Sequence, residues 1–170
     1  MLTLDNLLKN LDVKSETYFL PPKISGENPV QKIVDKKSPP YVISLIPSGL
    51  DLAWAFEKKS KVDFLDADFD YLKEFLSIVF TDELNLSTDF EMVKENSTIH
   101  VTMKDFILQE LCENIHKVEG QICNRVPCPV CSAIACALTK VTHAAIGIER
   151  TRLSDDTLEV WFKISELKPE

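Results

Sequence analysis

The chain has 170 residues and a formal net charge of −8, and 45% of its residues are hydrophobic. This length suits a single domain with a sizeable core, and the acidic balance argues against a nucleic-acid partner, because phosphate contacts need basic surface. No apolar run reaches the roughly 20 residues of a membrane span, and the N-terminus lacks the basic start and apolar core of a signal peptide. We therefore expect a cytoplasmic protein.

The first forty residues differ in pattern from the rest. Leucines at helical spacing predict a short amphipathic helix over residues 3–11. The prolines of residues 13–40 disfavour both helix and strand and predict an extended connector, with one helical turn near residues 30–34. We therefore expect residues 1–40 to form an N-terminal helix and a Pro-rich connector, and residues 41–170 to form the domain.

Helical and strand patterns alternate through the rest of the chain. Apolar residues spaced by three and four predict helices, and short β-branched or alternating runs predict strands. The two last pairs of strands are separated by short polar turns, which is typical of antiparallel hairpins. We therefore predict an α+β fold, a single domain with an antiparallel sheet covered by helices. The predicted helices are 49–59, 66–80, 105–118 and 129–142, and the predicted strands are 41–46, 90–93, 98–103, 145–152 and 158–164.

All five cysteines lie in one cysteine-rich loop, residues 112–136. Five is an odd number, which argues against a closed disulfide framework. Cys128 precedes Pro129, and proline is favoured at the first position of a helix. Because the N-terminus of a helix stabilises a thiolate, the loop is predicted to contain a metal-binding or reactive sulfur.

The spacing of the cysteines favours a zinc site. Zinc in structural sites takes four nitrogen or sulfur ligands. Cys123, Cys128 and Cys131 are separated by four and two residues, and such a run can wrap around one ion. Cys112 and His116 share one face of the preceding helix, because they are four residues apart, and either could supply the fourth ligand.

Two alternatives use the same residues differently. Cys128 and Cys131 could be a redox pair of a thiol-based enzyme or switch, although the βαβ context of thioredoxin-like proteins is missing. The cysteines could also pack only as small apolar side chains, as we expect for Cys136. The protein would then be a non-catalytic adaptor that binds other proteins.

The order of elements in residues 90–164 (hairpin, helix, cysteine loop, helix, hairpin) resembles the 4-vinyl reductase domain family, a relative of the TRAPP transport-complex subunits. Cys128-Pro-Val-Cys131 and the small residues after it are similar to that family's cysteine and following helix. Ile146-Gly-Ile-Glu149 is similar to its next strand with a glutamate, and Val160-Trp-Phe162 to its final strand.

The resemblance implies a pocket for a small apolar ligand and frequent homodimers, and it implies no enzymatic activity. Glu149, and His143 at the end of the preceding helix, are the candidate pocket residues. Arg152 and Val160 stand where the family places further cysteines, so any zinc would have to be held differently. We therefore expect a ligand-binding or sensory module with a zinc-linked cysteine loop.

Overall fold

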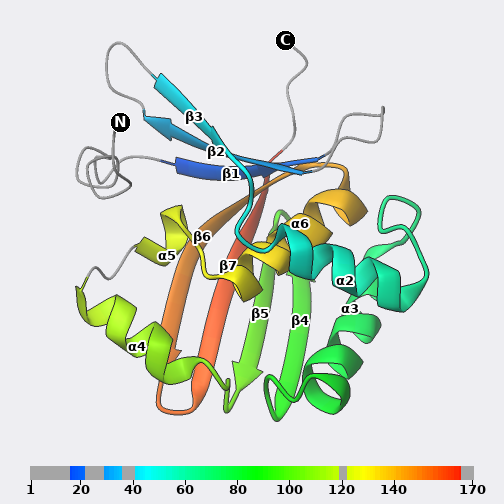
Figure 1. Cartoon of the computed structure of the whole chain (residues 1–170), viewed down its shortest axis with the longest axis vertical. Helices are drawn as coiled ribbons and strands as arrows, with labels where there is room; N and C mark the ends of the chain where they lie inside the picture. Colours follow the sequence, from blue (N-terminus) through cyan, green and yellow to red (C-terminus); the bar gives the residue numbers. More distant parts are fainter. Residues whose placement is uncertain (1–15, 22–28, 36–40, 119–121, 166–170) are drawn as a thin grey trace.

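The seven strands of the computed structural model form one antiparallel sheet, and the helices pack against it (Figure 1). The structure describes residues 16–21, 29–35, 41–118 and 122–165, so the helix predicted at residues 3–11 lies outside the described residues. The predicted class, an α+β fold with an antiparallel sheet covered by helices, is confirmed.

The strand order across the sheet is β3-β2-β1-β6-β7-β5-β4. Two C-terminal hairpins, β4–β5 and β6–β7, form one half of the sheet, and the three N-terminal strands extend it beyond β6. The strands are β1 (Glu16–Leu20), β2 (Val30–Asp35), β3 (Tyr41–Leu45), β4 (Asp89–Glu95), β5 (Thr98–Lys104), β6 (Ala145–Ser154) and β7 (Thr157–Ser165).

The connector predicted for residues 13–40 is wrong where strands β1 and β2 form, and the helical turn predicted near residues 30–34 is part of β2. Pro21 follows β1 and Pro29 precedes β2, so these prolines flank the strands and remove no hydrogen bond from the ladder. In Figure 1 the three N-terminal strands run across the top of the molecule, over the ends of β6 and β7.

All four predicted helices form: the one predicted at 129–142 has these bounds, the other three have shifted ends, and a short helix at 122–125 was not predicted. The helix predicted from residue 66 begins after Asp68, whose carboxylate accepts a hydrogen bond from the Tyr71 amide and so caps the helix. The helix predicted from residue 105 begins later, because Asp105 has a left-handed φ of 48°. The helical elements are α2 (Leu50–Ser60), α3 (Phe69–Ile78), a π-helical turn (Val79–Glu83), α4 (Gln109–Val118), α5 (Ile122–Arg125) and α6 (Pro129–Thr142).

Helix α6 is the centre of the core. Every residue from Val130 to Thr139 is buried, and this segment packs with the inward side chains of the sheet, such as Val160 and Phe162. Gly49, just before α2, lies so close to the first turn of α6 that an added Cβ would be 2.2 Å from the Pro129 carbonyl oxygen. Within the described residues, no helix has the length and apolar character needed to cross a bilayer.

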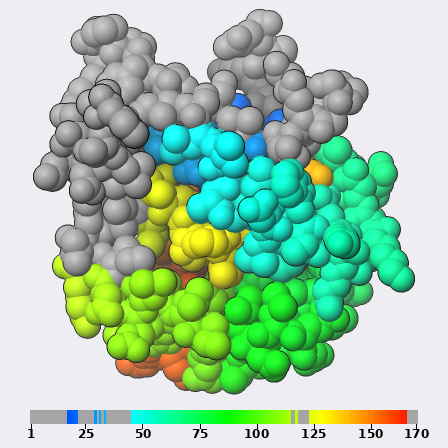
Figure 2. Space-filling model, in the orientation of Figure 1, coloured from blue at the N-terminus to red at the C-terminus, as the bar shows by residue number. Residues whose placement is uncertain are grey.

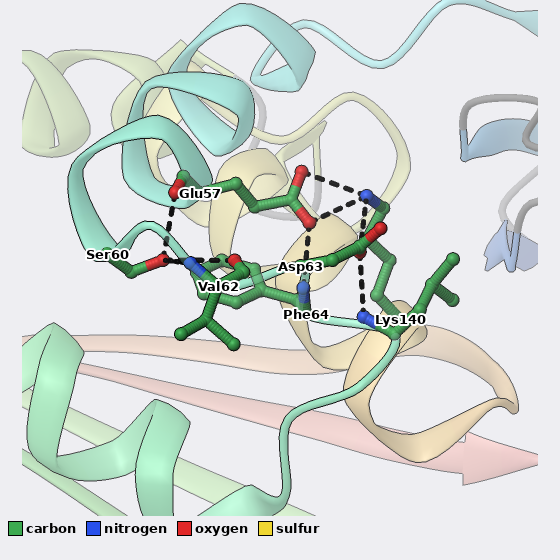
Figure 3. A network of polar contacts seen from close by, with 7 residues as sticks. Glu57, Ser60, Val62, Asp63, Phe64 and Lys140 are labelled. Carbon is green, nitrogen blue, oxygen red and sulfur yellow. Dashed lines mark hydrogen bonds and ion pairs between the residues drawn. The ribbon is translucent and has the colours of Figure 1, made fainter.

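A partly buried ion pair fixes the other end of α6 (Figure 3). The Lys140 ammonium lies 2.7 and 2.9 Å from the two carboxylate oxygens of Glu57 on α2, and 3.5 Å from Oδ1 of Asp63. The backbone amide of Phe64 also donates to the Glu57 carboxylate, at 2.9 Å. The pair therefore ties α2, the turn after it and α6 together.

Candidate thiol centre

Four of the five cysteines come together where α4, α5 and α6 meet. Cys112 lies in α4 and Cys123 in α5, and Cys128 and Cys131 lie at the start of α6. In Figure 2 the surface of α5 and the start of α6, in yellow, lies between the α2 region in cyan and α4 in yellow-green. All five cysteines are within the described residues and are free thiols.

The start of α6 places Cys128 at the centre of this group. Cys128 is the N-cap residue, with an extended backbone (φ −60°, ψ 160°), and Pro129 occupies the first helical position as predicted. The carbonyl oxygen of Cys128 accepts the first hydrogen bond of the helix, from the Ser132 amide at 2.9 Å. Cys128 is half-buried, whereas Cys112, Cys123 and Cys131 are buried.

Hydrogen bonds at Cys128 favour its thiolate. The thiols of Cys112 and Cys131 donate to its sulfur, and the backbone amides of Cys131 and Val130 add further donors. These donors, with Cys112 the strongest, lower the pKa of Cys128 to about 3 despite the opposing effect of burial. Cys128 is therefore the first of the four thiols to lose its proton.

The neighbouring thiols shift in the opposite direction. Cys112 and Cys131 have raised pKa values, first because they donate to Cys128 and second because they are buried. Burial, followed by the charge on Cys128, raises the pKa of Cys123 to about 11. The directions of these shifts therefore favour Cys128 as the site of a single thiolate in the group.

The thiols are not arranged as a preformed metal site. Among the residues that the structure describes, no three His, Cys, Asp or Glu side chains are placed to hold a metal ion. Tetrahedral zinc bonds of about 2.3 Å place sulfurs roughly 3.8 Å apart.

The structure does not place the other predicted ligand, His116, relative to this group, and the predicted pocket residues His143 and Glu149 lie on the surface. His116 is in α4, and its side chain is not among those described. Cys136 is buried further along α6, where burial raises its pKa to about 12 and the charged neighbour that acts on it is Lys140. His143 is exposed at the C-cap of α6, and Glu149 is exposed at the bulge of β6.

The loop between α5 and α6 is bonded to the N-terminal strands, a feature that the sequence analysis missed. The carbonyl oxygen of Arg125 accepts hydrogen bonds from Thr17 Oγ1 on β1 (3.0 Å) and Gln31 Nε2 on β2 (2.9 Å). Both donor side chains are buried. The partners are 108 and 94 residues apart in sequence, so no local pattern could have indicated them.

The start of α2 is bonded to the same loop. Ser48 Oγ donates to the carbonyl oxygen of Pro127 at 3.0 Å, and the Gly49 amide donates to Ser132 Oγ at 3.0 Å. The cysteine-bearing segment is therefore held by β1, β2 and α2 as well as by its own helices.

Among the described residues, three surface cavities of about 440 to 460 Å³ have no cysteine in their lining. One lies between α4 and the β6–β7 turn and is lined by Glu113, Lys117, Leu153 and Asp155. The other two lie along α3 and β4. Their linings are rich in charged side chains.

Comparisons with known proteins returned no similar protein: no family model, no curated protein and no solved structure matches this chain.

Proposed function

We propose that the chain is a non-catalytic binding module in which Cys112, Cys123, Cys128 and Cys131 hold one zinc ion. The observation that supports this proposal is the convergence of four thiols from three separate segments at the N-terminus of α6. A redox pair needs two thiols, whereas a structural zinc centre needs four ligands, all of which can be thiolates.

The surroundings of the four thiols suit a soft divalent cation. Four thiolates around Zn²⁺ carry a net charge of −2, and the positive end of the α6 dipole and the amides of Val130 and Cys131 offset part of it. Binding releases the protons of the thiols and turns the side chains toward one point. The ion would cross-link α4, α5 and α6, so its binding energy would stabilise the fold.

Elemental analysis of the purified, reduced chain after exposure to zinc tests the proposal. We expect about one zinc per chain for the wild type and for Cys136→Ser, which removes a buried thiol of the same helix outside the group. Cys128→Ser should lose the metal, with folding of both variants checked by circular dichroism. Wild-type protein that holds no zinc, or Cys128→Ser that holds as much as the wild type, refutes it.

A dithiol–disulfide switch is the second candidate, favoured by the half-buried Cys128 thiolate with Cys131 hydrogen-bonded to it one turn later. The Cys128 thiolate would attack a small disulfide and release one thiolate. Deprotonated Cys131 would then attack the mixed disulfide and release the second thiolate, leaving an internal disulfide. Mass spectrometry after incubation with glutathione disulfide separates the candidates: an internal disulfide in a chain that takes up no zinc favours the switch.

The resemblance to 4-vinyl reductase domains adds a homodimer and a small apolar ligand to the proposal, and His116 stays an alternative fourth ligand. The charged linings of the three cavities do not favour an apolar ligand in them. Native mass spectrometry tests the homodimer, and a monomer at every concentration contradicts it.

A further inference from the structure

Strand β4 is an edge of the sheet, because among the described strands it pairs with β5 alone. In Figure 1 it lies at the right of the sheet, beside α3. An edge strand carries a row of backbone N–H and C=O groups that can pair with a further strand. The pairing of β4 with β5 on the other side is complete, since every residue of β4 has a partner residue in β5.

The hairpin turn decides which groups of β4 point outward. Only Asn96 and Ser97 separate β4 from β5, so Glu95 and Thr98 form the hydrogen-bonded pair that closes a two-residue hairpin. Alternation then directs the backbone groups of Phe90, Met92 and Lys94 away from β5. The contact of Ser77 Oγ with the Phe90 carbonyl oxygen, at 3.4 Å, agrees with this direction, because Ser77 lies in α3.

Two cavities follow this edge and give it room for another segment. One is lined by Ser77 and Ile78 of α3 with Phe90 and Glu91 of β4, and the other by Phe69 of α3 with residues 92–94. Lys73 lines both, so the two cavities adjoin along α3 and β4, and together they are called the groove below. Ile78 is 53% exposed and gives the groove an apolar floor at one end. The weak bond from Ser77 is one that an incoming backbone N–H could replace.

The charged side chains of β4 indicate which residue types a partner strand at this edge needs. Asp89, Glu91 and Glu95 are exposed on the sheet face opposite the core, and Phe90 and Met92 point into the core. Lysine or arginine opposite these carboxylates is favourable, and a like charge there is unfavourable. A partner strand therefore needs basic residues at alternate positions, with apolar residues between them facing the groove.

The same charges argue against β4 of a second copy. When β4 pairs antiparallel with β4 of a second copy about a two-fold axis, one residue lies opposite its own counterpart. Only this arrangement keeps the core-facing side chains of both strands on the same face of the sheet. Centring on Met92 places Asp89 opposite Glu95, and centring on Glu91 places that carboxylate opposite itself. Centring on Val93 places Glu91 opposite Glu95. Each arrangement brings like charges together.

We propose that the groove between α3 and β4 binds an extended peptide of alternating basic and apolar residues, which adds an antiparallel strand to β4. The residues opposite Phe90, Met92 and Lys94 donate and accept the backbone hydrogen bonds and place apolar side chains in the groove. The residues between them place basic side chains beside Glu91 and Glu95. Strand addition of this kind takes its affinity from the backbone and its specificity from alternate side chains.

Calorimetry of the full chain with a synthetic peptide tests the proposal. The peptide has seven residues, alternates lysine and valine with lysine at both ends, and has both termini blocked. Two derivatives carry the same charge: one is N-methylated on the valines, whose N–H groups point to β4, and the other on the inner lysines, whose N–H groups point away. We expect methylation of the valines to weaken binding by at least about 10-fold and methylation of the lysines by less than about 2-fold.

Variants of the chain supply the matching test. Glu91→Lys combined with Glu95→Lys should weaken binding of the lysine peptide by at least about 10-fold. Asp51→Lys combined with Glu110→Lys, at exposed positions on α2 and α4, makes the same change in net charge and should leave binding within about 2-fold. Equal binding of the two methylated peptides, equal effects of the two double variants, or no binding at about 1 mM peptide would each overturn the proposal.

Discussion

Gly49→Ala is expected to be among the most damaging single-methyl additions to this chain. The new Cβ would lie 2.2 Å from the Ala133 nitrogen and from the Pro129 oxygen, and 2.8 Å from the Ser132 carbonyl carbon. The first two distances are more than 1 Å inside the roughly 3.5 Å at which non-bonded heavy atoms rest, and the third is also well inside it. All three atoms belong to the backbone of α6, so no side chain can turn aside. The start of α2 must move away from α6, and the hydrogen bond from the Gly49 amide to Ser132 is strained or lost.

Overpacking of a core usually costs about 1–3 kcal/mol, and a clash with helix backbone belongs at the upper end, so we expect a loss of about 3 kcal/mol. For a chain of this size that corresponds to a fall in Tm of roughly 6–12 °C. Urea unfolding followed by circular dichroism measures it. Gly147→Ala is the matched control: its nearest neighbour would be the Thr17 carbonyl oxygen at 3.3 Å, and we expect a loss below about 1 kcal/mol. A loss below about 1 kcal/mol for Gly49→Ala, or equal losses for the two variants, would refute the close-approach argument.

Three further predictions concern the buried polar and thiol groups. Lys140→Met should cost about 2 kcal/mol, because it leaves the partly buried Glu57 carboxylate without its cation. Adding Glu57→Gln should recover more than half of that loss in urea titrations, and a fully additive loss would contradict the coupling. Burial in the folded chain raises the pKa of the Cys136 thiol to about 12. The stability that the protonated thiol contributes is therefore complete below its ordinary pKa and is lost as pH rises from about 9 toward 12. Cys136→Ala should therefore reduce the alkaline slope of the unfolding free energy by about 1.4 kcal/mol per pH unit, and an unchanged slope would contradict the raised pKa. Thr17→Val removes a buried hydrogen-bond donor to the Arg125 carbonyl oxygen and should cost about 1 kcal/mol of stability. Amide hydrogen exchange in β1 should become faster, and exchange as slow as in the wild type would show that this bond does not hold the strand.

Local patterns predicted the part of the fold that depends on local contacts. The alternation of Leu158, Val160 and Phe162 predicts β7 because every second residue faces the core, and this strand is where it was expected. The proline at the start of α6 indicated Cys128 as its N-cap for the same local reason. Strands β1 and β2 were missed because their prolines lie at strand ends, and a count of prolines does not distinguish that position from an interruption.

The candidate site was predicted in composition better than in geometry. Clustering of the cysteines along the chain predicted that Cys123, Cys128 and Cys131 would meet, with Cys112 or His116 beside them. In the structure Cys112, Cys123 and Cys131 all act on the pKa of Cys128 or respond to its charge, and the side chain of His116 is not described. Sequence spacing could not indicate that Cys128 would accept hydrogen bonds from two other thiols, since this depends on the angle at which α4 meets α6. The bonds from β1, β2 and α2 to the same segment depend on tertiary contacts alone.

The long-range bonds to Arg125 also constrain when the N-terminal strands can take their places. Strands β1 and β2 pair locally with each other, but their anchors, the Arg125 carbonyl and the Gly147 region of β6, are made about a hundred residues later. At ribosomal rates of 5–20 residues per second, residues 17 and 125 emerge roughly 5–20 s apart. During that interval β1–β3 form at best an isolated meander with apolar side chains such as Phe19 and Ile33 uncovered. These apolar side chains are therefore exposed to aggregation until α6 and β6 have been made, and polar replacements of Phe19 or Ile33 should lower both the stability of the folded chain and its yield in the cell.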